Sequence, residues 1–363
     1  MIERIAKLRQ KFKGNQLEAL FITNQYNVCY LTGFTGLSPN ERESFLFITA
    51  TQASLLTFPT YYGLFKEGGS GFQTLSITGS KRLVDHLNEI IGTEKIKIVG
   101  FEKQNLTVGE LESLTNKLNA KLRPTEYLVE ELRLIKGENE IRQIKKAAQI
   151  TDLAFTYIKT RIKKGVSEKE LALDLEFYLK RKAGNVAFPP IVAFNKNAAI
   201  PHYLPENRQH LTDNSLILLD FGAKVNGYCA DMTRVVFFGN PNNKQVKIYN
   251  TVLKAQELTL KKLRPELLAN EVDFVAREYI KSSGFPEYPH GLGHGVGLAI
   301  HEAPRLKSES TEVLKENMVV TVEPGIYLEG ECGVRIEDLV VLKKDGLEIL
   351  SKSPKLLKEL IIL

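Results

Sequence analysis

Hydrophobic residues in the first third of the chain gather in short runs that are typical of β-strands, separated by longer amphipathic stretches. The strand-like runs cover 17–23, 44–49, 53–58 and 95–100, residues 84–91 and 111–118 show helical spacing, and 27–33 is a further apolar segment. Strands that alternate with helices predict a small α/β domain, which we place at residues 1–125. His86 is the only histidine in it, so we expect this domain to be non-catalytic.

The pattern changes near residues 122–140, where Pro124 interrupts it and a long amphipathic helix follows. Apolar residues between 141 and 158 lie on one face of that helix, among lysine, arginine and glutamate residues. A second domain is therefore predicted at residues 126–363.

The second domain shows the order helices, strand pair, helices, strand pair. Its second helix is expected to begin at Ser167, because Ser167 and Glu170 have the spacing of a capping box. The later predicted elements are strands at 215–220 and 228–238, helices at about 243–263 and 270–282, and strands at 318–324, 333–342 and 347–350. This repeated order suggests an internal duplication within an α+β domain.

Composition and charge exclude several classes of protein. The 363 residues are 43% hydrophobic and 25% charged, which is ordinary for a globular protein. The net charge is +6, but basic and acidic residues are interleaved, so nucleic acid is not an expected partner. No uncharged apolar run approaches the ~18–20 residues of a membrane span, and residues 1–14 have the pattern of an amphipathic helix rather than a signal peptide. Three widely separated cysteines fit a reducing compartment, so we expect a cytoplasmic protein.

Four carboxylates and one histidine stand out in the second domain as candidates for chemistry. They are Asp220, Asp231, His294, Glu323 and Glu337. Each alone is as readily a turn cap or a core histidine, but like charges clustered at buried strand ends repel and need a polycation. A pair of metal ions shared by bridging carboxylates would compensate them. Ligands that are mostly oxygen with one imidazole favour Mn²⁺ or Co²⁺, with Fe²⁺ and Zn²⁺ as alternatives.

Glycines at positions 291, 293, 295 and 297 raise the alternative of a nucleotide-binding loop. Their spacing, G-x-G-x-G-x-G, differs from the dinucleotide fingerprint, and no G-K-[ST] follows. We expect them instead to let the backbone around His294 pass close to a metal or a substrate.

Several segments resemble the signature segments of the pita-bread-fold metallopeptidases, and in particular those of the Xaa-Pro dipeptidase (prolidase) and aminopeptidase P group. In the second domain they are DFGAKVNGYCADMTR, PHGLGHGVGLAIHEAPR, VEPG and RIED. In the first they are NVCYLTGFTG and ERESFLFIT, which resemble the non-catalytic N-terminal domain of that group. The resemblance implies an α/β N-terminal domain followed by an α+β pita-bread (creatinase/aminopeptidase) domain with two pseudo-twofold halves, each of helices and a hairpin.

The resemblance also implies roles for the metal ligands. Asp220 would chelate one ion, and Asp231 and Glu337 would bridge both ions. His294 and Glu323 would bind the second ion. A hydroxide held between the metals would attack the peptide carbonyl, since coordination lowers the pKa of water toward neutrality. Glu323 would also carry a proton to the leaving nitrogen.

Further residues would act on the substrate if the resemblance holds. His202 would line the proline pocket, and His290 and His301 would flank the scissile carbonyl and its oxyanion. Arg305, in HEAPR, would grip the free carboxylate of a dipeptide in bidentate geometry. Each has a simpler alternative, because His202 could be a loop residue, His301 a turn cap and Arg305 a surface side chain.

Arg335 lies two residues before Glu337 in a predicted strand, so both side chains would face the same side of the sheet. The resemblance implies that Arg335 orients the bridging carboxylates.

The function that follows is hydrolysis of the peptide bond before proline, with Xaa-Pro dipeptides favoured. Aminopeptidase P activity on longer peptides is the enzymatic alternative, and a non-catalytic pita-bread-fold binding protein is the alternative of another class. Proteins of that last kind lose ligands, whereas every ligand position here holds a residue type that can bind metal. The resemblance further implies a homodimer that acts on proline-containing di- or oligopeptides.

Overall fold

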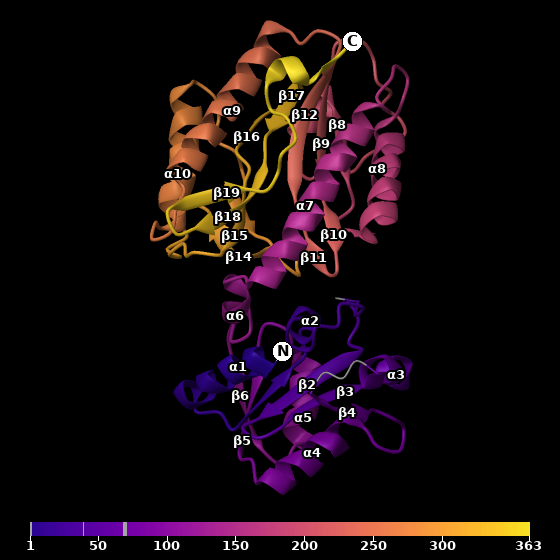
Figure 1. Ribbon diagram of the computed structural model, residues 1–363, viewed down its shortest axis with the longest axis vertical. Helices are drawn as coiled ribbons and strands as arrows, with labels where there is room; N and C mark the ends of the chain where they lie inside the picture. The colour runs from indigo at the N-terminus through magenta and orange to yellow at the C-terminus, as the bar shows by residue number, and fades with distance from the viewer. Residues whose placement is uncertain (1, 39, 68–70) are drawn as a thin grey trace. The chain divides into compact units, whose positions relative to one another are not determined.

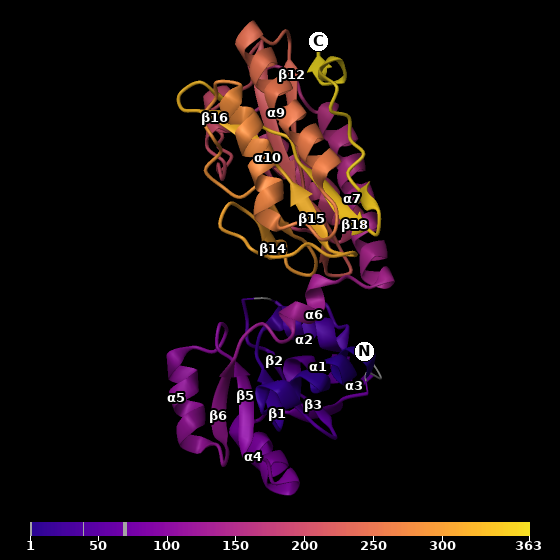
Figure 2. The same cartoon turned by 90° about the vertical axis from the view of Figure 1, so that its left-hand side faces the viewer.

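The computed structural model describes residues 2–38, 40–67 and 71–363. The chain forms two compact units, Met1–Arg133 and Leu134–Leu363, each with its own sheets and helices (Figures 1 and 2). Within the described ranges, no helix combines the length and the apolar character that crossing a membrane requires.

The N-terminal unit is built on one mixed sheet with the strand order β4-β3-β2-β1-β5-β6. Its strands are β1 (Ala19–Ile22), β2 (Ser44–Thr49), β3 (Ala53–Thr57), β4 (Gln73–Ser76), β5 (Ile98–Glu102) and β6 (Lys121–Thr125). Its helices are α1 (Ile2–Asn15), α2 (Gln25–Thr32), α3 (Pro59–Glu67), α4 (Leu83–Glu94), α5 (Val108–Lys117) and α6 (Glu130–Leu134), the last of which ends in the C-terminal unit. The sheet packs on α4 and α5 through a core that includes Phe47, Leu87 and Leu114. The predicted α/β architecture is confirmed.

The apolar segment at 27–33 lies mostly in helix α2. Asn24 caps the start of the helix by accepting a hydrogen bond from the Tyr26 N–H at 2.9 Å, and Gly33 ends it in the left-handed conformation, at φ 78°. Nearly every residue of α2 is buried. Its sequence therefore lacks the polar face by which an amphipathic helix is recognised.

Two packed helix pairs flank the strands of the C-terminal unit, α7 with α8 and α9 with α10 (Figures 1 and 2). The helices are α7 (Glu138–Lys159), α8 (Glu168–Ala183), α9 (Asn243–Lys262) and α10 (Ala269–Ser282). The predicted capping box at the start of α8 is present. The Ser167 hydroxyl accepts from the Glu170 N–H, and the Glu170 carboxylate accepts from the Ser167 N–H.

The strands of the C-terminal unit form two sets, one after each helix pair. The first set comprises β7 (Asn185–Val186), β8 (Ile191–Phe194), β9 (Ser215–Phe221), β10 (Ala223–Val225), β11 (Tyr228–Cys229) and β12 (Met232–Phe238). The second comprises β13 (Gly293–Gly295), β14 (Glu302–Leu306), β15 (Val319–Val322), β16 (Gly325–Leu328), β17 (Cys332–Arg335), β18 (Asp338–Lys343) and β19 (Gly346–Ile349). The sheet orders are β20-β12-β9-β8 and β11-β10-β7 in the first set, with β20 (Ile361–Ile362) added from the C-terminus, and β14-β13-β15-β18-β19 and β16-β17 in the second. This is the duplicated helix–hairpin arrangement that the sequence suggested.

The strands predicted at 228–238 and 333–342 are each interrupted, and an acidic residue lies at each interruption. The first breaks between β11 and β12 at Asp231, and the second breaks between β17 and β18 at Glu337. Glu323 lies at a similar break between β15 and β16. At each break the chain passes from one sheet to another, which leaves these carboxylates outside the strand ladders. Apolar residues continue on both sides of the breaks, so the hydrophobic pattern did not reveal them.

The glycines of β13 allow neighbouring strands to approach closely. A Cβ atom on Gly293 would lie 2.1 Å from the backbone oxygen of Thr321, and one on Gly295 would lie 2.1 Å from that of Ala303. Both contacts are impossible, so glycine is required where β13 packs between β15 and β14. The close approach is to neighbouring strands.

Candidate metal centre and active site

One cavity of about 630 Å³ in the C-terminal unit is lined by all ten candidate metal-ligating, catalytic and substrate-binding residues of the sequence analysis. The candidate metal ligands among them are Asp220, Asp231, His294, Glu323 and Glu337, and the other polar candidates are His202, His290, His301, Arg305 and Arg335. They come from both strand sets, so the cavity lies where the duplicated halves meet.

Asp231, His294 and Glu337 each offer a ligand atom, and these atoms lie within 4.8 Å of one another. His294 Nδ1 lies 3.1 Å from the Gly295 carbonyl, which can only accept, so Nδ1 carries the proton. Burial lowers the pKa of His294 to about 3, so the ring is neutral and Nε2 presents a lone pair. That nitrogen lies 3.7 Å from Asp231 Oδ2 and 3.4 Å from Glu323 Oε1. A lone pair that faces carboxylates is stabilised when a cation lies between them.

Three carboxylate oxygens of this cluster are buried and have no hydrogen-bond partner. They are Asp220 Oδ1, Asp231 Oδ1 and Glu337 Oε1. Burial, and then the charge of Glu337, raises the pKa of Asp231 well above its usual range. Burial, and then the charge of Glu323, does the same to the pKa of Glu337. The donor set therefore fits a divalent cation, which would neutralise the like charges and occupy the open oxygen positions.

Glu323 faces the same cluster from the end of β15. The Thr321 hydroxyl donates to Glu323 Oε1 at 3.1 Å, and Arg335 Nε lies 4.0 Å from Oε2. Burial raises the pKa of Glu323 to about 7. Burial therefore favours the protonated form of Glu323 in the metal-free cavity.

Arg335 contacts a different set of groups from the one expected. Its guanidinium Nη2 donates to Asp220 Oδ2 at 2.6 Å, and its Nε donates to the Thr233 hydroxyl at 3.0 Å. Thr233 in turn donates to Glu337 Oε2 at 2.7 Å, so this threonine links the guanidinium to Glu337. The strand ends at Arg335, and the two side chains therefore do not alternate along one continuous ladder.

The His290 ring is held at both nitrogens. Its Nδ1 lies 2.7 Å from the Gly291 carbonyl and its Nε2 lies 2.8 Å from the Tyr327 hydroxyl. Burial lowers the pKa of His290 to about 4, so the ring is neutral, Nδ1 donates to the carbonyl and Nε2 accepts from Tyr327. The Tyr327 oxygen accepts from Arg335 NH1 at 2.8 Å. The contacts of His290 therefore do not support direct donation to an oxyanion; they support orientation of Tyr327 and Arg335.

His202, His301 and Arg305 line the cavity with exposed side chains. The ring of His301 lies 4.5 Å from that of His294, and partial burial, together with the charge of Arg305, lowers the pKa of His301. Arg305 is paired directly with His294 across β13 and β14. Because opposite residues of a strand pair share one face of the sheet, the pairing directs Arg305 toward the ligand cluster.

Two family models match this chain. Residues 142–344 match Metallopeptidase family M24, and residues 4–135 match the Creatinase/Prolidase N-terminal domain. The chain belongs to metallopeptidase family M24. The resemblance stated from the sequence motifs is confirmed, and so is the pita-bread fold that it implied.

Relatives of this M24 chain cover almost its whole length. An Xaa-Pro dipeptidase of Pyrococcus furiosus is 35% identical, over 98% of this chain and 99% of its own. The structure of an Xaa-Pro dipeptidase from Bacillus anthracis has a TM-score of 0.93 at 36% identity and covers 99% of both chains. The structure of an X-Pro aminopeptidase from Thermotoga maritima has a TM-score of 0.87 at 34% identity and covers 96% of this chain and 98% of its own. Two named activities therefore occur among close structural neighbours.

Two polar residues of the M24 site were missed from the sequence. Thr233 joins Arg335 to Glu337, and Tyr327 joins Arg335 to His290. Both lie in apolar strand runs, where threonine and tyrosine are ordinary strand residues. The available signals were the place of Thr233 within the segment DFGAKVNGYCADMTR and the closeness of Tyr327 to Glu323 in the sequence.

Proposed function

We propose that this protein is a dinuclear-metal-dependent peptidase that hydrolyses the bond before proline, with Xaa-Pro dipeptides as favoured substrates. The observation that carries the proposal is the cluster of ligand atoms from Asp231, His294 and Glu337, which lie within 4.8 Å of one another. It lines a cavity in which buried oxygens of Asp220, Asp231 and Glu337 have no hydrogen-bond partner. The names of the relatives, Xaa-Pro dipeptidase and X-Pro aminopeptidase, support the same substrate class. A complete ligand set argues against a non-catalytic binding protein.

The residues present would hold two ions. Asp231 and Glu337 would be shared between them, Asp220 would complete one site, and His294 and Glu323 would complete the other. When bound, the ions would supply a hydroxide nucleophile at neutral pH for attack on the peptide carbonyl. The oxygen-rich donor set favours Mn²⁺ or Co²⁺, with Fe²⁺ and Zn²⁺ as alternatives.

The chain's own side chains would bind substrate and move protons. His301 would donate to the oxyanion, since its ring is exposed to the cavity, and His202 would line the proline pocket. Glu323 would pass a proton to the leaving nitrogen. Arg335 would hold Asp220 in place for the metal.

Arg305 supports a preference for dipeptides. A dipeptide presents its free carboxylate one residue beyond the scissile bond, and a guanidinium binds a carboxylate in bidentate geometry. The alternative is aminopeptidase P activity on longer peptides, which the similarity to the Thermotoga maritima enzyme supports. We further propose a cytoplasmic homodimer; Cys229 and Cys332 are buried free thiols, in keeping with a reducing compartment.

Hydrolysis assays on purified protein test the proposal. Protein is dialysed against chelator, reloaded with Mn²⁺ or Co²⁺, and assayed on Ala-Pro and Ala-Pro-Ala. We expect no activity without metal, restoration by either ion, and faster cleavage of Ala-Pro. Full activity of metal-free protein would overturn the metal mechanism, and equal cleavage of both peptides would favour aminopeptidase P.

A further inference from the structure

A buried glutamine on α9 joins the two strand ends that carry Glu323 and Glu337. Gln256 is 0% exposed. Its Nε2 group donates to the Val322 carbonyl at 3.1 Å and to the Ile336 carbonyl at 3.0 Å. Each carbonyl belongs to the peptide group that immediately precedes one of the two glutamates. One side-chain amide therefore holds together the peptide planes from which both carboxylates project.

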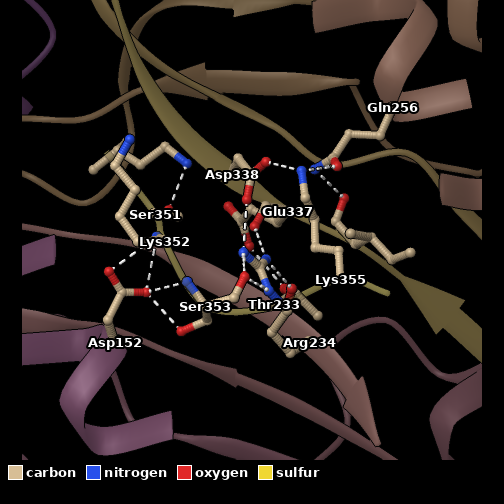
Figure 3. Close-up of polar contacts among 12 residues, drawn as sticks. Asp152, Thr233, Arg234, Gln256, Glu337, Asp338, Ser351, Lys352, Ser353 and Lys355 are labelled. Atoms are coloured by element: carbon tan, nitrogen blue, oxygen red, sulfur yellow. Dashed lines mark hydrogen bonds and ion pairs between the residues drawn. The ribbon is translucent and has the colours of Figure 1, made fainter. Parts of the chain in front are cut away.

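The orientation of this amide is determined by the contact of its oxygen atom. Lys355 Nζ donates to Gln256 Oε1 at 2.8 Å. Because an ammonium group can only donate, the oxygen of the amide must face Lys355 and both N–H groups must face the strands. Lys355 also forms an ion pair with Asp338 (Figure 3).

The same polar cluster reaches the backbone of Glu337 from a second direction. Asp338 Oδ1 accepts from Arg234 NH2 at 2.7 Å, and Arg234 NH1 donates to the carbonyls of Thr233 and Glu337 (Figure 3). Arg234 and Asp338 have fully buried side chains. Buried charges of this kind hold a geometry well only when every partner is satisfied, as it is here.

The described residues that line the cavity do not include Gln256, Lys355, Asp338 or Arg234. The cluster lies behind the carboxylates and touches the main chain that carries them. Glu323 and Glu337 lie at facing breaks, between the Val322–Asp338 pair of β15 and β18 and the Gly325–Arg335 pair of β16 and β17. The amide of Gln256 adds a side-chain link across this interruption, from α9 to the carbonyls that precede both glutamates.

We propose that Gln256 is a positioning residue that sets the separation of Glu323 and Glu337, and through it the affinity of the weaker-bound metal ion. The inference rests on the proposed function, in which these glutamates help to hold two ions. Groups behind metal ligands typically change metal affinity by about 10- to 100-fold when removed.

The test compares two variants with a matched control. Gln256→Met keeps the length and removes all three hydrogen bonds, and Gln256→Glu keeps the shape and the contact with Lys355 but removes the donors. Thr259→Val is the control, because Thr259 is 0% exposed on the same helix and its hydroxyl donates only to Ala255 within that helix. Calorimetric titration of metal-free protein with Mn²⁺ gives the stoichiometry and affinity of each ion, and thermal melting of the metal-free variants gives their stability.

The wild type and Thr259→Val are each expected to bind two ions, and the affinity for each ion is expected to be the same in both proteins. In Gln256→Met and Gln256→Glu the weaker-bound ion is expected to lose about 10- to 100-fold in affinity. Their metal-free Tm is expected to fall below that of the control, because two buried carbonyls lose their donor, so the titrations are made at a temperature at which the variants are folded. Wild-type affinity for both ions in either folded Gln256 variant would overturn the inference. If Gln256→Met does not fold, the affinities measured with Gln256→Glu are the test. A wild-type protein that binds fewer than two ions would instead overturn the proposed function, independently of any variant.

Discussion

The Nε2 atom of His294 is a hydrogen-bond acceptor that faces carboxylate oxygens, which are also acceptors. Without a cation between them, this contact is unfavourable. The Gly295 carbonyl holds the proton on the other ring nitrogen, and burial keeps the ring neutral. Nearby, oxygens of Asp220, Asp231 and Glu337 are buried without donors. Each such atom costs ~1–3 kcal/mol when left unpartnered, and more when charged. The individual side chains are thus arranged for a cation.

Charge-removing substitutions at the shared carboxylates are the direct test at this scale. Asp231→Asn and Glu337→Gln keep the shape but replace a bridging anion with a neutral amide, so each variant should bind fewer than two ions and lose most activity. Metal analysis of the purified variants, alongside assays with Ala-Pro, checks this. Asp213→Asn is the control, because Asp213 is exposed and pairs with Lys164 at the surface. Two bound ions and near-normal turnover in either variant would show that the bridging assignment is wrong.

Arg305 provides a test of substrate length. A charge-assisted hydrogen bond contributes about 1.5–3 kcal/mol, so Arg305→Ala should lower kcat/KM for Ala-Pro by roughly 10- to 100-fold and leave cleavage of Ala-Pro-Ala nearly unchanged. Lys307→Ala is a matched control, because Lys307 is an exposed cation that lines the same cavity. Equal losses on both peptides in Arg305→Ala would return this arginine to a structural role.

At the scale of elements, buried acidic residues tie the loops of the cavity to helices. Glu168, at the start of α8, accepts from the Phe194 N–H at 2.6 Å, from Asn197 Nδ2 at 2.9 Å and from the Tyr203 hydroxyl at 2.7 Å. These contacts anchor the segment that carries His202. On α10, Asp273 and Arg277 form an ion pair, and Arg277 donates to the His290 carbonyl at 2.5 Å. Helices that lie outside the cavity therefore determine where its histidines lie.

Removal of one oxygen atom should weaken the hydrogen bonds that hold the segment carrying His202. Tyr203→Phe removes the hydroxyl that donates to the buried Glu168 carboxylate and accepts from Asn197, which costs about 1.5–3 kcal/mol, or roughly 10- to 100-fold, in holding the segment. We expect a KM for Ala-Pro that rises by about that factor, with kcat and metal content unchanged. Steady-state kinetics with metal analysis check this, with Tyr157→Phe on α7 as the control. A variant that loses kcat at constant KM would place Tyr203 in the chemistry instead of in substrate binding.

Element types were predictable where the hydrophobic period was clean, as in α7, α9 and β9. Helix α2 was recognised only as an apolar segment, because a helix buried on most sides has no polar face. The breaks at Asp231 and Glu337 were missed for a related reason, since apolar residues flank both. Tertiary contacts decide where those strands end, and no local pattern records them.

Over the whole molecule, motif order along the chain was sufficient to predict the duplicated fold and ten of the residues that line the cavity. Contacts between segments that are far apart in the sequence were not predictable in the same way. Gln256 lies on a helical face that reads as ordinary core, and its role appears only when Val322 and Ile336 are seen beside it. The resemblance pointed to side chains that face the substrate, whereas the groups behind them follow from the three-dimensional packing.

The coupling of metal, protons and stability is a property of the whole chain. Burial raises the pKa of Glu323 to about 7 and raises those of Asp231 and Glu337 in the metal-free protein, whereas unfolded carboxyl groups titrate near ~4. A raised folded pKa contributes stability that is fully present below the unfolded pKa and is lost as the pH rises through the folded pKa. Metal-free protein should therefore become less stable between about pH 4 and pH 7 on account of these groups.

Metal binding should reverse this trend. Ions require ionised carboxylates, so binding displaces the retained protons and strengthens as the pH rises. We expect the increase in Tm caused by saturating Mn²⁺ to be larger at pH 8 than at pH 6, and we expect proton release on titration with Mn²⁺ at pH 6. Thermal melts with and without Mn²⁺ at both pH values, together with calorimetry in two buffers of different ionisation enthalpy, measure the two effects. Glu323→Gln should reduce the proton release at pH 6, whereas Asp213→Asn should not. An equal increase in Tm at both pH values, without proton release, would mean that these carboxyl groups are already ionised before the metal arrives.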